Sequence, residues 1–524
     1  MYLKIGTLGF TVASSPAAAR AFLQTLDLLL LLPFLIFLFR HRLHTAPHLP
    51  LPPGPRGWPL LGALPFLGPL PHAALAALAK HYGPIMYLKI GTLGFAVASS
   101  PAAARAFLQT LDLPFADRPL NTVARHVSYG GQDLVFADYG PLWKLLRRLS
   151  TTHLLGPRSL PQWAAARRSE AGHTVRSILD LSLRGEPVRV QEVAMVALAN
   201  MLGLATLSRR VFDSDGEESG EFKSMILEVM RLGALTNVGD MVPSIAWLDV
   251  QGIERCTKRL HERFDALVSR MLREHEDTAD QREGKPDFVD CLLADCKSLE
   301  GEVALSDANI KGLVLDMFIA GTDTSSIAIE WAIAELLKNH SILKRAHLEL
   351  DEVIGRDRML EESDIPKLPY LQAICKEVFR MHPTTPLSLP HLSNQACEVE
   401  GYCIPKGTRL LVNIWAIGRD PEIWENPLEF NPERFLGGKG ANIDLQGTDF
   451  KLMPFGGGRR ICVGKNLGIL FVQYIVGTLL HSFDWVMPDG EALNMEEAPG
   501  LALQKAVPVN ALAKPRLASS AYDE

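Results

Sequence analysis

The sequence predicts a mainly α-helical fold: one large domain with a small β-rich part, behind an N-terminal membrane anchor. Residues 309–338 carry closely spaced apolar side chains that fit one long, largely buried helix. A second apolar helical pattern follows Gly464 and runs to Leu479. Within residues 80–515 no Ser/Gly-rich or low-complexity linker occurs, so one large domain is the simpler interpretation of the 524-residue chain.

The composition argues against several classes of protein. The net charge is −6, and Lys and Arg are scattered without an aromatic-interleaved basic tract, so nothing indicates nucleic-acid binding. The seven cysteines are odd in number and include no C-x-x-C pair. This argues against a disulfide framework and a zinc knuckle, and it suits a reducing compartment.

The N-terminus is duplicated. Residues 1–28 recur at 86–113, and the two copies differ only at Thr11 versus Ala96. A repeat that occurs twice and nowhere else is not a solenoid unit. In the second copy, alternating apolar residues, a glycine turn and a returning apolar stretch predict a β-hairpin, followed by a short helix at Pro101. A fold has one position for such a hairpin, so we hypothesise that the first copy is a non-native leader.

Residues 21–40 form the predicted membrane anchor. The uninterrupted apolar run 28–39 makes only ~18 Å of helix, but extension back to Ala21 gives ~28 Å, close to the ~30 Å hydrocarbon core. Asp27 weakens insertion without cancelling the Leu and Phe contributions. A cleaved signal peptide is the alternative, although the small-residue cleavage site is missing. Residues 41–58 form a basic, proline-rich hinge, whose charges favour a cytoplasmic flank and whose prolines make it stiff.

The strongest chemical signal is segment 455–464, Phe-Gly-Gly-Gly-Arg-Arg-Ile-Cys-Val-Gly. Glycines before Cys462 let the loop approach a flat ligand closely and place backbone N–H groups on the sulfur. The helix that follows Gly464 would point its N-terminus at the thiolate and lower its pKa. For this loop alone, the alternative is a buried structural cysteine in a glycine-rich turn.

A polar segment interrupts the long apolar helix at 320–326, Ala-Gly-Thr-Asp-Thr-Ser-Ser. Gly, Thr and Asp are poor helix formers and a buried acid is costly, so we expect a local distortion of the helix. Asp323 and Thr324 supply the titratable acid and the alcohol that a proton relay requires. The alternative is an N-cap at Thr322 or Asp323 that divides the segment into two shorter helices.

Two further pairs have helical spacing. Glu377 and Arg380 are three residues apart and can pair on one helix. Trp143 and Arg147 are four residues apart, which puts both on one helix face. Either pair alone is weak evidence, because most such pairs are ordinary surface contacts.

Together these segments resemble the cytochrome P-450 family. The loop 455–464 matches the family's F-x-x-G-x-R-x-C-x-G at each fixed position, and the other motifs follow in the family's order. The resemblance implies the P-450 fold, a helical prism with a small β-rich subdomain, as the catalytic domain at residues 59–524. It also implies a monooxygenase that uses O2 and holds haem b, with Cys462 as the axial ligand of the iron.

The resemblance assigns roles to individual residues. Thr324 would hydrogen-bond the dioxygen, and Asp323 would help relay protons to it. Glu377 and Arg380 would join Arg434, from a Pro-Glu-Arg-Phe segment, in a buried triad that holds the core around the haem. The expected haem-binding residues are Cys462, Arg460, Phe455, Gly458, Gly464, Trp143, Arg147 and His391.

One position departs from the family pattern. Related plant enzymes have Pro-Arg where this chain has Pro390-His391, and that arginine is a further contact to a haem propionate. Histidine offers fewer donors and is mostly neutral at pH 7. We therefore expect haem retention or potential to be altered.

Electrons from NADPH would reach the site through a separate NADPH-cytochrome P-450 reductase. The sequence has neither a G-x-G-x-x-G that opens a βαβ unit nor spare length for a flavin domain. Lys144, Arg148 and Lys465 are candidates for a basic docking face, with ordinary solvated charges as the alternative. The anchor and the resemblance predict an endoplasmic reticulum membrane protein with its catalytic domain on the cytosolic face.

Within the family the chain is similar to the plant flavonoid B-ring hydroxylases, in segments 320–326, 413–420, 481–485 and 500–508. Ala502 resembles the small residue of members that hydroxylate both the 3' and 5' positions, whereas 3'-only members tend to carry threonine. A smaller side chain leaves room for a ring that already bears a second hydroxyl. The implied substrates are flavanones and dihydroflavonols of flavonoid and anthocyanin biosynthesis. Candidate substrate residues are Ala320, Leu387, Ala502 and Leu503, within wider segments that include 123–128, 235–238 and 385–389.

Other functions stay open at this point. The chain could be a flavonoid 3'-monooxygenase, or a P-450 enzyme that acts on another plant phenolic or a terpenoid. A haem-binding protein without turnover is the alternative from another class, motivated by the duplicated N-terminus and His391. Asp323 and Thr324 argue against a non-oxidative haem-thiolate isomerase, since such enzymes need no dioxygen protonation.

Overall fold

The computed structural model describes residues 2–5, 8–11, 49–212, 217–282, 284–298 and 304–523. Contacts divide the chain into two units, residues 1–51 with 400–403, and the remaining residues. The predicted anchor at 21–40 and the first part of the hinge, up to residue 48, lie outside the described residues.

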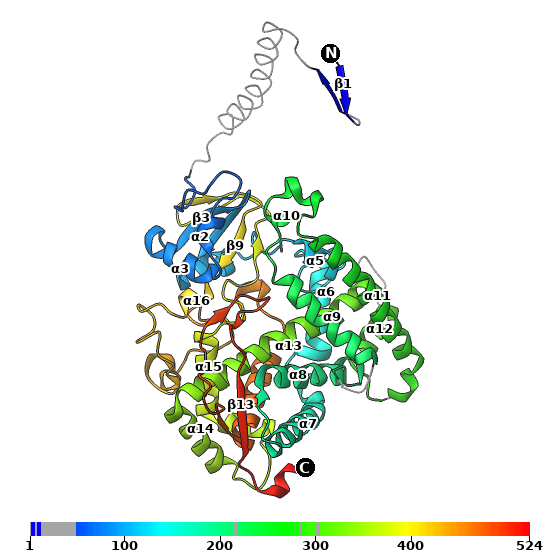
Figure 1. The fold of residues 1–524 in the computed structure, drawn as a ribbon, viewed down its shortest axis with the longest axis vertical. Helices are drawn as coiled ribbons and strands as arrows, with labels where there is room; N and C mark the ends of the chain where they lie inside the picture. The colour runs from blue at the N-terminus through cyan, green and yellow to red at the C-terminus, as the bar shows by residue number, and fades with distance from the viewer. Residues whose placement is uncertain are drawn as a thin grey trace. The chain divides into compact units, whose positions relative to one another are not determined.

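The larger unit is mainly helical, as the sequence predicts. Its central helix, α13 (Asp307–Lys338), contacts α8, α15 and α17 and runs through the middle of the helical body (Figure 1). Ser306 and Asn309 start this helix with a reciprocal capping box. The other helices are α2 (Leu64–Leu67), α3 (Pro71–Tyr82), α4 (Pro101–Arg105), α5 (Thr122–Val127), α6 (Pro141–Ser150), α7 (Ala164–Leu183), α8 (Val190–Leu207), α9 (Glu217–Gly233), α10 (Val238–Met241), α11 (Ile253–Asp277), α12 (Phe288–Ser298), α14 (His340–Val353), α15 (Pro369–Met381), α16 (Ile414–Ile417) and α17 (Lys465–Ser482).

A four-stranded sheet with the order β3-β4-β9-β6 forms the main β part. β4 and β9 are parallel, and the other two pairs are antiparallel. The strands are β1 (Tyr2–Ile5), β2 (Leu8–Thr11), β3 (Ile85–Ile90), β4 (Leu93–Ala98), β5 (Val188–Arg189), β6 (His391–Leu392), β7 (Cys397–Val399), β8 (Tyr402–Ile404), β9 (Arg409–Val412), β10 (Phe483–Val486), β11 (Glu497–Ala498), β12 (Gln504–Lys505) and β13 (Asn510–Pro515).

The duplicated segment forms the same hairpin twice. Tyr2 pairs with Thr11 in β1–β2, and Tyr87 pairs with Ala96 in β3–β4, so the register is identical. Only the second hairpin belongs to the four-stranded sheet, where β4 pairs with β9. Ala96 is fully buried there, and a threonine at this place would bury a hydroxyl group. The sheet therefore suits the second copy better than the first.

Two helices in the described part of the chain, α8 and α13, are long and apolar enough to cross a membrane. Most of each helix is packed inside the protein, with 72% and 78% of the apolar windows buried. Both are therefore core helices of the larger unit.

Candidate functional site

Cys462 lies in the loop between the short helix at Gly458–Arg460 and the start of α17. Its side chain opens into a cavity of about 260 Å³, whose walls come from α6, α13, α15, α17 and the glycine loop. Burial raises the pKa of the thiol, while a backbone hydrogen bond from Gly464 and the charges of Arg147 and Lys465 oppose that rise. The surroundings thus supply a donor and two cations for a thiolate.

The glycines of the loop have distinct tasks. Gly458 has φ +66°, and a Cβ atom there would lie 1.7 Å from the carbonyl oxygen of Leu108. This residue therefore lets the loop pack against the neighbouring chain, although it does not line the cavity. Phe455 does line the cavity and packs against Phe379, with ring centroids 5.4 Å apart.

α13 forms the opposite wall. Ala320, exposed on an otherwise buried helix, and Thr324 both line the cavity. The helix is continuous through 320–326, so the alternative of two shorter helices is wrong. The hydroxyls of Thr322 and Thr324 instead donate to the carbonyls of Phe318 and Ala320, at 2.5 and 2.7 Å. These bonds satisfy the two hydroxyl groups within the helix.

Asp323 lies beside Thr324 but is not part of the cavity wall. Burial raises the pKa of its carboxyl to about 6. An acid with this pKa exchanges its proton near neutral pH, which suits a relay group.

Three buried or half-buried arginines, Arg118, Arg147 and Arg460, line one part of the cavity. Arg460 donates to the carbonyls of Ala116 and Ala137, and Arg118 donates to those of Leu389 and Pro390, at 2.6 and 2.9 Å. The Nη1 atom of Arg460 and the Nε atom of Arg118 are buried without a hydrogen-bond partner among the described residues.

The pKa values of the three arginines show how strongly burial disfavours their charged forms. Burial lowers the pKa of Arg118 to about 9, with the charge of Arg460 as a second cause. Burial also lowers the pKa of Arg460 to about 10 and that of Arg147 below its ordinary value. Buried cations whose donors are unpaired indicate a missing anion.

Trp143 completes this end of the cavity. The guanidinium groups of Arg147 and Arg460 lie 5.3 and 4.6 Å from the centroid of its buried ring. A mainly apolar cavity lined by a cysteine sulfur and by three arginines fits haem b, which is a flat apolar ring with two carboxylates. The residues present therefore fit this cofactor.

Arg118 is the site residue that the sequence motifs miss. An arginine followed by Pro119 in the apolar stretch 113–120 is the only signal, and that signal does not separate a buried cation from a surface one. The fold brings Arg118 against Pro390 and His391 from far along the chain.

His391 is buried, lines the cavity and makes a 2.8 Å hydrogen bond through Nδ1 with the carbonyl of Phe115. Its pKa lies well below the ordinary value because of burial and the charges of Arg118 and Arg460. The side chain is therefore neutral, as expected. Arg118 places a guanidinium group beside His391, so this part of the cavity has a cation although the histidine is neutral.

We expect Arg118→Leu to weaken haem binding by about 10- to 100-fold, because a charge-assisted hydrogen bond contributes about 1.5–3 kcal/mol. The rate of haem transfer to an apo-globin measures this loss. Arg148→Leu is the matched control, since Arg148 is exposed on α6, and it should leave the rate unchanged. Equal rates for the two variants would contradict the assignment of Arg118 to the haem carboxylates.

Glu377, Arg380 and Arg434 meet in the core behind the cavity. Glu377 accepts hydrogen bonds from Arg380, at 2.7 Å through both of its oxygens, and from Nε of Arg434 at 2.9 Å. Arg380 also donates to the carbonyls of Gly418, Pro427 and Glu429. The three residues join α15 to the segment 418–434 that leads to the cysteine loop.

Of the four candidate substrate residues, one lines the cavity and three do not. Ala320 lines the cavity, as do Thr385, Ser388 and Leu389. Leu387 instead packs against the core cluster of the four-stranded sheet. Ala502 and Leu503 are buried one layer behind the wall, where the backbone N–H of Leu503 donates to the carbonyl of Thr384, at 2.8 Å.

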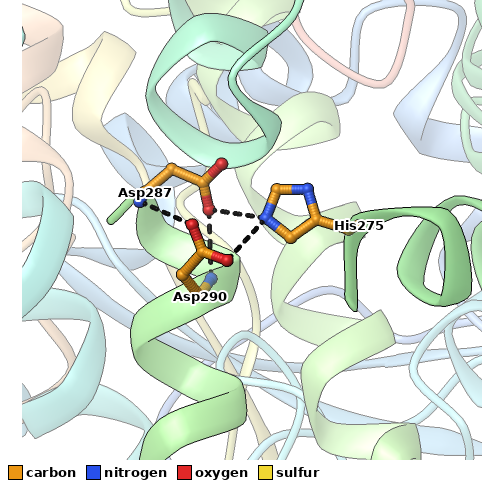
Figure 2. A group of neighbouring side chains, drawn as sticks. All are labelled: His275, Asp287 and Asp290. Atoms are coloured by element: carbon orange, nitrogen blue, oxygen red, sulfur yellow. Dashed lines mark hydrogen bonds and ion pairs between the residues drawn. The ribbon is translucent and has the colours of Figure 1, made fainter. Parts of the chain in front are cut away.

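A second polar cluster lies away from the cavity, at the junction of α8, α11 and α12. His275 contacts Asp287 and Asp290, and these two aspartates cap α12 by exchanging backbone hydrogen bonds (Figure 2). Ser208 donates to Asp287, and Arg282 donates to both oxygens of Asp290. The carboxylates thus have protein partners, and the Arg282 guanidinium group also lies 3.8 Å from Asp287.

A chelator should therefore leave the melting temperature of the protein unchanged. Asp287→Ala should lower the free energy of unfolding by about 3 kcal/mol, since it removes one partner of a buried charged network. Asp280→Ala, an exposed position in the same connection, serves as the control. A chelator-induced drop in melting temperature that Asp287→Ala abolishes would show that a metal is bound here.

Comparisons with known proteins agree with this geometry. Residues 52–510 match the sequence model of the cytochrome P-450 family. A flavonoid 3',5'-hydroxylase of Eustoma exaltatum subsp. russellianum is 60% identical over 473 residues, which are 90% of this chain and 92% of that protein. A flavonoid 3'-monooxygenase of Arabidopsis thaliana is 46% identical over 511 residues, 95% of this chain and 99% of that protein.

The fold matches solved structures as well. A zebra fish cytochrome P-450 solved with abiraterone superposes with a TM-score of 0.71 at 29% identity, covering 85% of this chain and 100% of that one. Members of this family hold haem b and use NADPH-derived electrons that a reductase delivers. The chain therefore belongs to the cytochrome P-450 family of haem monooxygenases.

Proposed function

We propose that this enzyme hydroxylates the B ring of flavonoids, at both the 3' and the 5' positions of flavanones and dihydroflavonols. The observation that carries the proposal is the higher identity to the 3',5'-hydroxylase than to the 3'-monooxygenase, 60% against 46%. The mainly apolar cavity, with its few polar groups on α13 and at 384–388, suits a flat phenolic substrate.

Haem b, when bound, supplies the activation of O2. The residues of this chain hold and surround it. Gly464 donates its N–H to the sulfur of Cys462, and Arg118, Arg147 and Arg460 offer cations to the two carboxylates. Ala320 leaves open space on α13 above the sulfur side of the cavity.

Proton delivery falls to α13 in this proposal. The Thr324 hydroxyl lies on the cavity wall and can exchange its bond to the Ala320 carbonyl for one to the reacting oxygen. Asp323 would pass protons from solvent to this hydroxyl. The residues Leu503 and Ala502 would affect substrate fit indirectly, through Thr384.

Asp323 provides a test with opposite signs for stability and activity. Its folded-state pKa of about 6 exceeds the ordinary value of 3.8, so the buried carboxylate destabilises the fold as pH rises from about 4 to about 6. Asp323→Asn should raise the free energy of unfolding at pH 8 by about 3 kcal/mol, a gain that disappears near pH 4. Turnover should fall about 100-fold or more. Denaturant unfolding at both pH values and product formation check this, and unchanged turnover would remove Asp323 from the relay.

We also propose that the enzyme is held on the endoplasmic reticulum membrane by residues 21–40, with the hinge at 41–58 leading to a cytosolic catalytic domain and residues 1–28 as a non-native leader. Exposed apolar side chains support a membrane-facing side. Their segments adjoin through the hydrogen bonds of Gly91 with Leu61 and of Thr92 with Met241. The exposed side chains are Trp58, Leu60, Leu61, Phe66, Trp247, Leu248 and Val250.

Electrons would come from NADPH-cytochrome P-450 reductase. Lys144 and Arg148 are exposed on α6, the helix that also carries Trp143 and Arg147. Lys465 starts α17 directly after the cysteine loop. These three cations would form the docking face for an acidic partner, with turnover that falls as salt rises.

Co-expression with a plant NADPH-cytochrome P-450 reductase and feeding of naringenin tests the proposed function. A product heavier by two oxygen atoms is expected. A product with one added oxygen would assign the 3' position alone and remove Ala502 as the discriminating residue. Absence of product despite a normal reduced-CO band would contradict the proposed function and would indicate another substrate, failed coupling to the reductase, or a haem-binding protein without turnover.

A further inference from the structure

Two buried acids, Asp316 and Asp133, pair beside the cavity, and Asp316 lines its wall. Asp316, on α13, lines the cavity and is 9% exposed, and Asp133, on the loop before α6, is 2% exposed. The two carboxyl groups share a hydrogen bond. Neither residue is used by the haem site or by the proton relay.

The fold holds this pair in place from both sides. Oδ2 of Asp316 accepts from the backbone N–H of Leu134 at 2.9 Å, and Oδ1 of Asp133 accepts from that of Phe136 at 2.8 Å. Asp133 packs directly over Gly312, where an added Cβ would lie 3.1 Å from the Asp133 Cβ. The loop is therefore docked on α13 next to the pair.

The raised pKa values of the two acids favour a neutral polar ligand over a cation. Burial raises the pKa of Asp133 to about 7, and burial together with the charge of Asp133 raises that of Asp316 well above its ordinary value. At least one proton is thus retained near neutral pH. A cationic ligand would need both acids ionised, which burial opposes, whereas a hydroxyl group can donate to and accept from such a pair.

Asp316 has capacity left for a ligand. A protonated carboxyl group offers one O–H donor and further acceptor positions, and an ionised one offers about four lone-pair positions. Its partners in the protein are the N–H groups of Leu134 and Val135 and the carboxyl of Asp133. The side chain faces the cavity, so the remaining position is open to a bound molecule.

The position on the helix defines which part of a ligand Asp316 can reach. Asp316, Ala320 and Thr324 are spaced by four residues and all line the cavity, so they form one stripe on α13. Eight residues of helix separate Asp316 from Thr324 by about 12 Å. A three-ring phenolic with its reacting ring at Thr324 would extend across Ala320 toward Asp316.

We propose that Asp316 is a specificity-determining residue, which hydrogen-bonds a phenolic hydroxyl at the end of the substrate remote from the ring that is hydroxylated. The proposal rests on the proposed flavonoid substrate, where this group is a hydroxyl of the A ring. Asp133 is a positioning residue that holds Asp316 and shares its proton.

The test compares naringenin with the flavanone that keeps the B-ring hydroxyl but lacks both A-ring hydroxyls. For the wild type we expect kcat/KM and affinity by equilibrium dialysis to favour naringenin by about tenfold or more, the effect of one hydrogen bond to an acid. Asp316→Leu should lose most or all of the preference for naringenin. Asp316→Asn keeps the shape of the side chain and its bonds to the loop, so it should lose less of this preference. This variant replaces Asp316→Leu in the comparison if the leucine variant does not fold.

Asn309→Ala is the matched control, because it removes the hydrogen bond that ties the same loop to α13 through the Gln132 carbonyl and leaves Asp133 and Asp316 in place. This variant should lower kcat/KM for both flavanones by the same factor, so the ratio between them stays as in the wild type. If Asp316→Leu lowers kcat/KM for both flavanones by the same factor, the residue is only structural and the inference fails. The inference also fails if the wild type has no preference for naringenin. If the wild type hydroxylates neither flavanone, the proposed function fails first, and this is seen before any variant is compared.

Discussion

Replacement of Cys462 by serine should abolish the reduced-CO band of a haem-thiolate and all substrate turnover. The sulfur opens into the cavity and has the Gly464 N–H group and two cations beside it, so it is the one group there that can supply a thiolate. Loss of an outer partner of a metal ligand reduces activity roughly 10–100-fold, and loss of the ligand itself should exceed this. Difference spectra and product formation from the purified variant measure both effects.

Cys256→Ser is the control for this experiment. Cys256 is an exposed residue on α11 and lies outside the cavity wall, so its replacement should leave the spectrum and turnover as in the wild type. A normal reduced-CO band in the Cys462→Ser protein would contradict the assignment of the sulfur ligand. Circular dichroism of both variants shows whether the fold is kept.

Glu377→Ala should be the most damaging change outside the cavity. The variant leaves two arginines, Arg380 and Arg434, in the core without their carboxylate. Removal of one partner of a buried ion pair lowers the free energy of unfolding by about 3–5 kcal/mol, a large part of the stability of a typical domain. We expect little soluble holoprotein and a lower denaturation midpoint.

A surface ion pair provides the comparison. Glu433 pairs with Arg345 on the same side of α15, but both side chains are about half exposed. Glu433→Ala should change the free energy of unfolding by less than about 1 kcal/mol. Similar stability losses for Glu377→Ala and Glu433→Ala would show that the triad is not the buried support inferred from its geometry.

Local patterns in the sequence predicted the elements of the fold well. The hairpin at 86–98 forms as expected because its alternation and its turn glycines are local signals, and the same sequence gives the same register in the first copy. The long helix at 309–338 follows from its continuous apolar pattern. The helix continues unbroken through 320–326, and the threonine hydroxyls bind carbonyls one turn earlier within it.

Contacts between distant segments were harder to predict. The motif spacing located Cys462, Arg460, Trp143 and Arg147, and the structure brings all four to one cavity. Arg118 was missed because only the fold shows that its guanidinium group is buried with an unpaired donor. The direction of a side chain at the end of a short strand or loop depends on such packing, which has no signature in the sequence.

The substrate residues show the same limit. Leu387 lies in the segment 384–389 that borders the cavity, yet it points into the core of the sheet. The buried acid Asp316 was not recognised, because an aspartate in an apolar helix pattern gives no indication of a partner such as Asp133. That pairing spans more than 180 residues and follows from how the loop docks on α13.

The central claim is that this cavity holds haem b through the sulfur of Cys462. X-ray absorption at the iron edge of the purified holoenzyme tests it most directly, with Cys462→Ser as the reference. The account predicts one sulfur scatterer in the first coordination shell of the wild-type iron and none in the variant. A first shell of nitrogen and oxygen alone in the wild type would contradict it.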